Sequence, residues 1–209
     1  MDDLWPRIIE TRRASVSPWM EVITRDVQLS SNAAVETYYA IGQPDYLVAL
    51  AVTPDSRILL VRQYRPAIER FSLELPAGLC EPNEDPFTAI ARELLEETGY
   101  LTSSVELIGR TATCASRITN SMYSFFIRTS ERRPDFVEEP GVSVSSALPE
   151  ELRQLLLAGE FCEQTHVGVL ALAAARIDQS LTDADLELRQ TLRASDRHGY
   201  CAATGRLDR

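Results

Sequence analysis

Short apolar stretches separated by polar turn residues predict a chain built mainly of β-strands. From residue 19 onward, β-branched and aromatic residues alternate with polar ones or gather in short runs, and turn-forming residues separate these segments. The first 18 residues follow no clear period, and we expect them to be loosely ordered or helical at their start. We expect strands over residues 19–29, 35–42, 45–53, 57–65, 71–78, 105–114, 121–130 and 141–147.

Helical periodicity occurs in three segments. The clearest covers residues 86–98, where Asp85 is typical of an N-cap and Gly99 is typical of a C-terminal stop. Residues 148–157 and 163–177 predict two further helices. The second of these is apolar enough to be largely buried, yet its apolar run is too short to cross a bilayer. The whole pattern predicts an α/β (α+β) fold, a mixed sheet with helices packed on it.

Shifts in composition divide the chain into three parts. We expect a small N-terminal β region over residues 1–44, a main domain over residues 45–178 and a polar tail over residues 179–209. The total of 209 residues suits one sizeable domain with a small appendage.

The charge and cysteine content restrict the partners and the compartment. The formal net charge is −10, and phosphate backbones bind basic surfaces, so we expect no nucleic-acid partner and no anionic membrane. Lysine is absent, which excludes lysine Schiff-base chemistry. The four cysteines are irregularly spaced and the first residues lack a signal-peptide pattern, so we expect a reducing compartment, the cytoplasm.

Four glutamates lie in and before the helix predicted at residues 86–98. Glu93, Glu96 and Glu97 are spaced i, i+3, i+4 and share one helical face, and Glu84 lies nine residues before the first of them. Like charges on one face repel one another unless they are compensated. Mg²⁺ binds carboxylate oxygens and would relieve this repulsion. A solvated acidic helix surface is the alternative interpretation.

The spacing of the whole segment decides between these interpretations. It follows the pattern G-x5-E-x7-R-E-U-x-E-E-x-G-U, in which U is a bulky apolar residue, with an aromatic residue at the last position. The segment resembles the Nudix box, the signature of hydrolases that cleave nucleoside diphosphates linked to another group. The matching residues are Gly78, Glu84, Arg92, Glu93, Leu94, Glu96, Glu97, Gly99 and Tyr100.

This resemblance implies a fold and a metal site. The fold would be an α/β/α sandwich with a mixed sheet, and residues 45–178 would form the Nudix catalytic domain. The reaction would be an attack of water on a pyrophosphate phosphorus that depends on Mg²⁺ or Mn²⁺. Arg92 would orient Glu84 through a bidentate pair, and Gly78 and Gly99 would support the box. By the resemblance, Glu93 and Glu97 are the main metal ligands, Glu96 is a further ligand or the base, and the Ala77 carbonyl completes the site.

The resemblance extends beyond the box over roughly residues 19–176. The segment LLVRQYRPAIERFSLELPAG is similar to ADP-ribose pyrophosphatases and related nucleoside diphosphate-sugar hydrolases, in which Arg65 would contact a phosphate. The RITN segment is similar to a loop of the same family and makes Arg117 a substrate-binding candidate. Trp19 either stacks on the nucleobase or packs in the core. A surface arginine is the alternative for Arg65.

A second acidic segment supplies candidates for the catalytic base. In this subfamily the base often lies in a mobile loop after the sheet strands, and DFVEEPGVSV matches that loop. Glu138 and Glu139 are therefore candidates, with Glu138 slightly preferred. An acidic loop without a catalytic role is the alternative.

The resemblance predicts hydrolysis of ADP-ribose or a related nucleoside diphosphate sugar by a homodimer. ADP-ribose-specific members commonly have a proline about fifteen residues beyond the box, where this chain has Ala115 and Ser116, so other sugar nucleotides stay open. A Nudix-fold sensor that binds such a ligand without cleavage is the alternative function. The intact box and the short acidic tail favour the enzyme.

Overall fold

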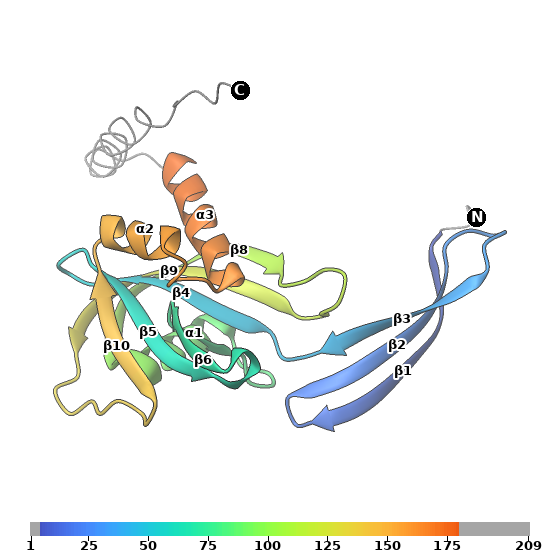
Figure 1. The fold of residues 1–209 in the computed structure, drawn as a ribbon, viewed down its shortest axis with the longest axis horizontal. Coiled ribbons are helices and arrows are strands. Elements are labelled where there is room, and N and C mark those ends of the chain that lie inside the picture. The colour runs from blue at the N-terminus through green and yellow to red at the C-terminus, as the bar shows by residue number, and fades with distance from the viewer. Residues whose placement is uncertain (1–4, 180–209) are drawn as a thin grey trace, which may run out of the picture.

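Ten strands and three α-helices form residues 5–179, the part of the chain that this computed structural model describes (Figure 1). The polar tail expected at residues 179–209 lies, apart from Gln179, outside those residues. The helices are α1 (Pro86–Thr98), α2 (Pro149–Leu157) and α3 (Gln164–Gln179). The strands are β1 (Arg7–Ser17), β2 (Met20–Gln28), β3 (Val35–Gly42), β4 (Tyr46–Val52), β5 (Ile58–Arg65), β6 (Arg70–Glu74), β7 (Ala77–Leu79), β8 (Tyr100–Ala112), β9 (Ser121–Arg132) and β10 (Val142–Ala147).

Seven strands form one mixed sheet in the body of the protein. Strands β10, β5, β4, β9 and β8 follow one another in this order, with β4 and β9 parallel and the other neighbours antiparallel. Strands β4 and β5 pair only beside their hairpin, where Val52 lies opposite Ile58. Beyond that point β6 pairs with β5 and β7 pairs with β4. The chain therefore leaves β5 and joins β4 at Leu75 and Pro76, which lie between β6 and β7.

The buried strands contribute side chains to two hydrophobic cores, one on each face of the sheet, because successive side chains of a strand point to opposite faces. In β4, Leu47, Ala49 and Ala51 pack in the core that includes α1. Val48 and Leu50 pack in the core that includes α2 and α3. The helices thus cover both faces of the sheet, and the expected α/β/α sandwich is confirmed (Figure 1).

Helix α1 begins and ends where the sequence predicts. The Asp85 carboxylate accepts a hydrogen bond from the Thr88 amide at 3.1 Å, as an N-cap does. Gly99 has a φ of 75°, a left-handed conformation that favours glycine, and its amide donates to the Leu95 carbonyl. Strand β8 follows at once from Tyr100, earlier than expected. Local capping signals therefore set the register of the helix that carries the glutamates.

The expectation of loose or helical structure before residue 19 is wrong, since β1 occupies this segment. It pairs with β2, and Arg12 forms an ion pair with Asp26 at 2.9 Å while Arg13 pairs with Glu21. Nearly every β1 residue is exposed, so the strand lacks the half-buried alternation by which strands are recognised. Strands β1, β2 and β3 form an arm that projects from the body (Figure 1).

Helix α3 is buried along one face rather than largely buried as expected. His166, Val169 and Ala173 are buried, whereas Ala171 and Ala174 are exposed. Alanine raises the apolar content of a helix without requiring burial, which explains the difference. No helix among residues 5–179 is both long and apolar enough to cross a membrane.

The burial of His166 predicts that its own contribution to stability is lost in mild acid. Burial lowers its pKa to about 4, with Glu74 and Glu163 opposing the shift and Arg65 adding to it. Between pH 4 and its ordinary value near 6.5, the unfolded chain binds more protons than the folded one. The contribution of His166 to the free energy of unfolding should therefore be fully present above about pH 6.5 and fall by up to about 3 kcal/mol as the pH drops towards 4.

Urea unfolding of the wild type and of His166→Asn across this pH range checks the prediction. The variant lacks the titrating ring and should lose less stability in acid than the wild type. Parallel profiles for the two proteins would contradict it.

Candidate active site

Helix α1 lies directly against the first residues of β7. A Cβ on Gly78 would overlap the Glu93 carboxyl group, so only glycine permits this approach. The Ala77 amide donates a hydrogen bond to Glu97 at 2.9 Å. Glu93 and Glu97 are partly buried here, whereas Glu96 is exposed. Two of the three helical glutamates are thus held between α1 and β7 rather than on an open helix surface.

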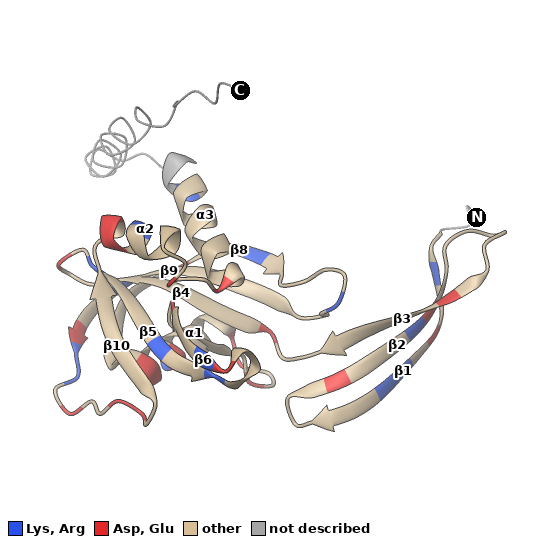
Figure 2. Cartoon of the chain, in the orientation of Figure 1, with Lys and Arg blue, Asp and Glu red and all other residues tan. Residues whose placement is uncertain are grey.

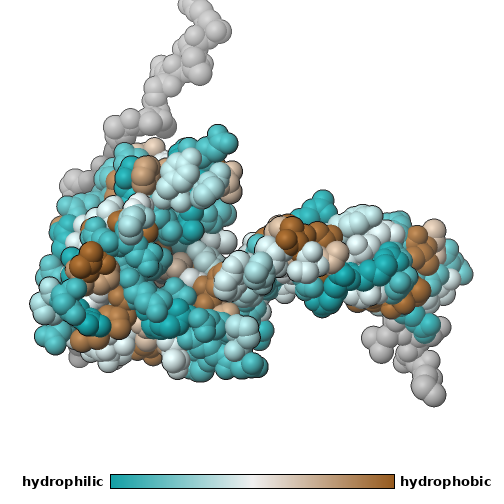
Figure 3. Space-filling view, turned by 90° about the horizontal axis from the view of Figure 1, so that it is seen from below, coloured by the Kyte–Doolittle hydropathy of each residue, from teal (hydrophilic) through white to brown (hydrophobic). Residues whose placement is uncertain are grey.

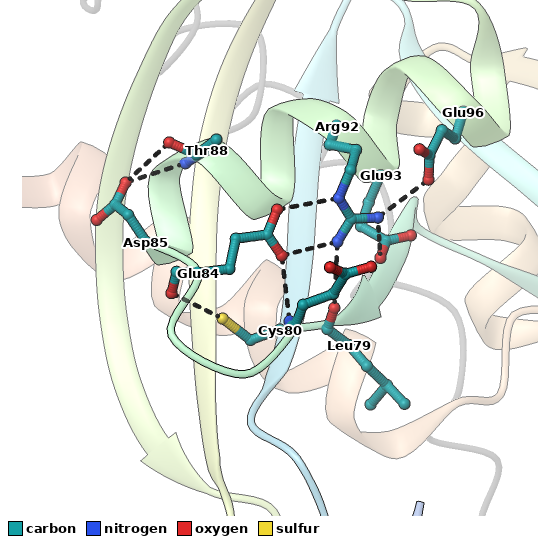
Figure 4. Close-up of polar contacts among 9 residues, drawn as sticks. Leu79, Cys80, Glu84, Asp85, Thr88, Arg92, Glu93 and Glu96 are labelled. Carbon is teal, nitrogen blue, oxygen red and sulfur yellow. Dashed lines mark hydrogen bonds and ion pairs between the residues drawn. The ribbon is translucent and has the colours of Figure 1, made fainter. Parts of the chain in front are cut away.

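Arg92 lies at the centre of the cluster and contacts three carboxylates (Figure 4). Its Nε and Nη2 donate to the two oxygens of Glu84 at 3.0 and 2.9 Å, a bidentate pair. Its Nη1 donates to Glu93 at 2.9 Å and to Glu96 at 3.0 Å. The hydrogen bonds from Arg92 hold the pKa of Glu84 below its usual value. One guanidinium therefore compensates most of the repulsion that the sequence implies.

Glu97 is not among the carboxylates that Arg92 contacts within the described residues. Burial raises the pKa of Glu97 to about 8, Glu93 adds to the shift, and the hydrogen bond from the Ala77 amide opposes it. Burial also raises the pKa of Glu93, although Arg92 opposes the shift. Further positive charge nearby would therefore stabilise the ionised forms of both Glu93 and Glu97.

The donor set fits a hard divalent cation. Within residues 5–179, no three His, Cys, Asp or Glu side chains already converge as a ligand set, and Arg92 binds Glu93 and Glu96 instead. The chemistry of the donors is nevertheless that of a Mg²⁺ site, because such sites use carboxylate oxygens together with a few neutral oxygens. The partly buried pair of Glu93 and Glu97 supplies the negative charge for it.

Replacing Arg92 with lysine is expected to destabilise the protein by about 2 kcal/mol, because one ammonium cannot bind Glu84 bidentately and also hold Glu93. Urea unfolding in the presence of a chelator measures this effect. Arg153→Lys is the matched control, since Arg153 makes one exposed contact with Glu150 at 3.4 Å. Equal stabilities for the two variants would show that a point charge satisfies the cluster.

Arg65, expected to contact phosphate, is paired within the chain. Its Nε donates to Glu74 at 2.8 Å, and its Nη2 contacts the second carboxylate oxygen. Glu74 is only 1% exposed, and its pKa lies below the usual value because the bonds from Arg65 outweigh its burial. Glu74 is the last residue of β6 and lies three residues before Ala77, whose amide contacts Glu97. The structure thus brings Arg65 to the edge of the glutamate site with its orientation fixed.

The acidic loop between β9 and β10 packs against the end of α1. Phe136 lies over Gly99, where a Cβ would overlap its ring, and the Arg133 amide donates to the Gly99 carbonyl at 2.8 Å. A cavity of about 420 Å³ separates this loop from α1 and is lined in part by Glu96 and Asp135. Acidic residues of the helix and the loop thus gather on one side of the body (Figure 2).

The two glutamates of this loop differ in their contacts. Glu138 accepts hydrogen bonds from Arg132 at 3.4 Å and from the Val144 amide at 3.3 Å. Arg132 also donates to the Thr98 carbonyl at the end of α1. Glu139 is exposed, and its side chain has no hydrogen-bond or ion-pair partner within the described residues. Glu138 therefore ties the loop to α1, while the carboxylate of Glu139 is available.

The structure does not place Trp19 and Arg117 in the glutamate site. Trp19 lies in the turn between β1 and β2 and is 60% exposed, so core packing within this chain is excluded. Arg117 is exposed in the loop between β8 and β9, and its carbonyl accepts a hydrogen bond from the Ile41 amide at 2.7 Å. Both residues lie in or beside the arm.

Two residues near the site escaped the sequence analysis. His166 is buried and pairs with the partly buried Tyr46, whose hydroxyl lies 2.8 Å from Nε2, and the histidine also contacts the segment before β7. The available signal was a single polar residue at the start of the apolar run 166–175. Its partners are distant in the sequence, so no local pattern points to them.

Comparisons with known proteins agree with this geometry. The NUDIX domain family matches residues 44–162. An ADP-ribose pyrophosphatase of Bacillus subtilis is 28% identical over 144 residues, which cover 68% of this chain and 77% of that protein. An ADP-ribose pyrophosphatase of Saccharomyces cerevisiae is 43% identical over 75 residues, 33% of this chain and 32% of that protein. The crystal structure of an ADP compounds hydrolase shares the fold, with a TM-score of 0.69, 20% identity, and coverage of 83% of this chain and 95% of that one. The chain therefore belongs to the Nudix family.

Proposed function

We propose that this chain hydrolyses the pyrophosphate bond of ADP-ribose or another nucleoside diphosphate sugar, releasing a nucleoside monophosphate and a sugar phosphate. The observation that carries the proposal is the pair of Glu93 and Glu97 beside β7, which burial leaves in need of positive charge. The two relatives named as ADP-ribose pyrophosphatases support the substrate class. Ala115 and Ser116, where a proline is common in ADP-ribose-specific members, keep other sugar nucleotides open.

Glu93 and Glu97 would hold a divalent cation, Mg²⁺ or Mn²⁺, with Glu96 and the Ala77 carbonyl as further ligands. When bound, such a cation supplies positive charge against the pyrophosphate and acidifies water. Arg92 keeps its bidentate pair with Glu84 and so holds the start of the helix in place. The protein's part is to position the carboxylates against β7.

Arg65 contributes a phosphate contact. It binds Glu74 through Nε and Nη2, which fixes the plane of its guanidinium and leaves Nη1 for an anionic oxygen. A raised KM with an unchanged kcat in Arg65→Lys would show this contact. An unchanged KM would assign Arg65 to the support of Glu74 alone.

Glu139 is the general base that takes the proton from the attacking water. Its carboxylate is exposed, whereas Glu138 is engaged with Arg132 and the Val144 amide. The loop is anchored at Gly99 by Phe136, and Phe136 and Glu96 line the same cavity, so a movement of the loop about this anchor would carry its acidic end towards the glutamate site. The contacts thus favour Glu139 over the residue that the sequence alone puts first.

A second copy of the chain covers the arm. Large apolar and aromatic side chains are exposed on β1, on β3 and in the turns that join the strands of the arm, and the space-filling view shows brown patches on the projecting arm (Figure 3). In a dimer, Trp19 of one copy would stack on the nucleobase bound by the other. Sedimentation equilibrium tests this arrangement, and a monomeric mass at micromolar concentration would exclude it. The exposed residues are Ile8, Ile9, Val16, Trp19, Leu29, Val35, Tyr38, Tyr39 and Ile41.

The compartment is reducing, which fits the cytoplasm. Cys80, Cys114 and Cys162 are free thiols in the described part of the chain. Alkylation of these thiols in freshly lysed cells tests the assignment. Their protection until a reductant is added would contradict it.

A substrate panel tests the function. ADP-ribose, GDP-mannose, ADP-glucose, UDP-glucose, NADH and diadenosine polyphosphates are each incubated with the protein and Mg²⁺, and the released products are quantified. We expect one nucleoside diphosphate sugar to be cleaved in preference to the dinucleotides. Binding of a sugar nucleotide without any cleavage would instead identify a ligand sensor.

A further inference from the structure

A buried histidine of α3 reaches the segment that joins β6 to β7. His166 lies in the first turn of α3, and its side chain is 0% exposed. Its Nδ1 accepts a hydrogen bond from the Leu75 amide at 3.0 Å, and its Nε2 lies 2.8 Å from the Tyr46 hydroxyl. A helix on the face of the sheet opposite α1 therefore contacts the chain two residues before Ala77.

The two contacts determine which ring nitrogen carries the proton. A backbone amide can only donate, so Nδ1 is the acceptor and Nε2 carries the hydrogen of the neutral ring. Nε2 then donates to the Tyr46 hydroxyl, and this bond fixes the plane of the ring. Burial lowers the pKa of His166 to about 4, so the ring is neutral near pH 7. The histidine is thus an oriented acceptor rather than an acid or a base.

Leu75 and Pro76 have no strand partner, because β6 ends at Glu74 and β7 begins at Ala77. Each of these two residues is held instead by a hydrogen bond, from the Leu75 amide to His166 and from the Ala49 amide to the Pro76 carbonyl. The flanking residues are also anchored by side chains, Glu74 by Arg65 and Ala77 by Glu97. Without His166, the Leu75 amide would be a buried donor with no acceptor, and the segment would move to find one.

We propose that His166, oriented by Tyr46, is a positioning residue for the carboxylate site. By holding the Leu75 amide, it fixes the segment that presents the Ala77 amide to Glu97, and so sets where that carboxylate lies on α1. The inference rests on the proposed function for its activity measurement, while binding of Mn²⁺ by the carboxylates is measured independently of any substrate.

Three variants alter these contacts, and a fourth is a control. His166→Phe keeps a ring and removes the acceptor, whereas His166→Asn retains an amide oxygen near the position of Nδ1. Tyr46→Phe removes the hydroxyl that orients the ring. Val169→Ala truncates a residue that is 0% exposed on the same helix, and so reports the effect of lost packing alone.

Calorimetric Mn²⁺ titration and steady-state hydrolysis are measured for all five proteins. We expect His166→Phe to weaken Mn²⁺ binding and to lower kcat by roughly 10–100-fold, as loss of a group that orients a metal ligand does, with a much smaller change in KM. Tyr46→Phe should show a smaller loss, about threefold to tenfold, the equivalent of one hydrogen bond. His166→Asn should recover most of the Mn²⁺ affinity, and Val169→Ala should lower only the unfolding midpoint.

Equal Mn²⁺ affinity and kcat in His166→Phe and Val169→Ala would reduce His166 to core packing and overturn the inference. If His166→Phe does not fold, Tyr46→Phe decides, because an unchanged Mn²⁺ affinity there would overturn it equally. A wild type that binds Mn²⁺ but cleaves no sugar nucleotide would refute the proposed function. The Mn²⁺ affinities of the variants would then still decide the role of His166.

Discussion

Replacing Glu97 with glutamine is expected to lower turnover by at least ~10²-fold while stabilising the metal-free protein by about 2 kcal/mol. Glutamine retains the oxygen that accepts the hydrogen bond from the Ala77 amide. It cannot supply a charged ligand, so the activity is lost. It also removes a carboxyl group whose burial raises its pKa to about 8, and with it the free-energy cost that this shift imposes on folding at neutral pH, so the metal-free fold gains stability.

Steady-state hydrolysis and thermal unfolding with a chelator check the two halves of this prediction. For a chain of this size, the expected gain corresponds to a rise in the unfolding midpoint of roughly 4–8 °C. Glu106→Gln is the control, because Glu106 is an exposed glutamate of β8 and should change neither quantity. A Glu97→Gln protein that keeps its turnover, or that unfolds at a lower temperature, would contradict the assignment of Glu97 to the charged centre of the site.

Glu139→Gln is expected to lower kcat by roughly 10²–10⁴-fold with little change in KM, the effect of removing a general base. Glu138→Gln should have a smaller effect on kcat. It removes the charge from the contact with Arg132 and so weakens the tie between the loop and the end of α1, and KM and kcat should therefore change together.

The pair of variants is its own control, because the two residues are neighbours in one exposed loop and both changes are isosteric. Stopped assays at saturating substrate give kcat for each. A larger loss of kcat in Glu138→Gln would assign the general base to Glu138. Small losses of kcat in both variants would show that neither glutamate is the base and that the loop has only a structural role.

Local signals explain why helix α1 could be predicted to the residue. Asp85 and Gly99 act through contacts within four residues of their own positions, so their effect on the helix ends can be predicted from the sequence. The carboxylates of α1 follow from the same register, because helical spacing alone places Glu93 and Glu97 one turn apart. The bidentate pair of Arg92 with Glu84 was expected only from the resemblance to the Nudix box, and the structure contains it.

Contacts between distant segments explain what the sequence did not predict. The strand β1 is held by cross-strand pairs such as Arg12 with Asp26, fourteen residues apart, and has no buried face to produce a period. The bond from the Leu75 amide to His166 spans 91 residues. The difference between Glu138 and Glu139 depends on where Arg132 points, which nothing in a run of two identical residues can encode.

The close contact of Gly78 with Glu93 has a consequence for how this sequence can vary. A side chain at position 78 would overlap the carboxyl group of a residue that is 15 positions later in the chain. The two positions are therefore epistatic, because a methyl group at the first displaces the carboxyl end of the second. In a randomised library, selection for activity should keep glycine at position 78 wherever position 93 is glutamate, whereas selection for folding alone should admit alanine, because the flexible Glu93 side chain can turn away.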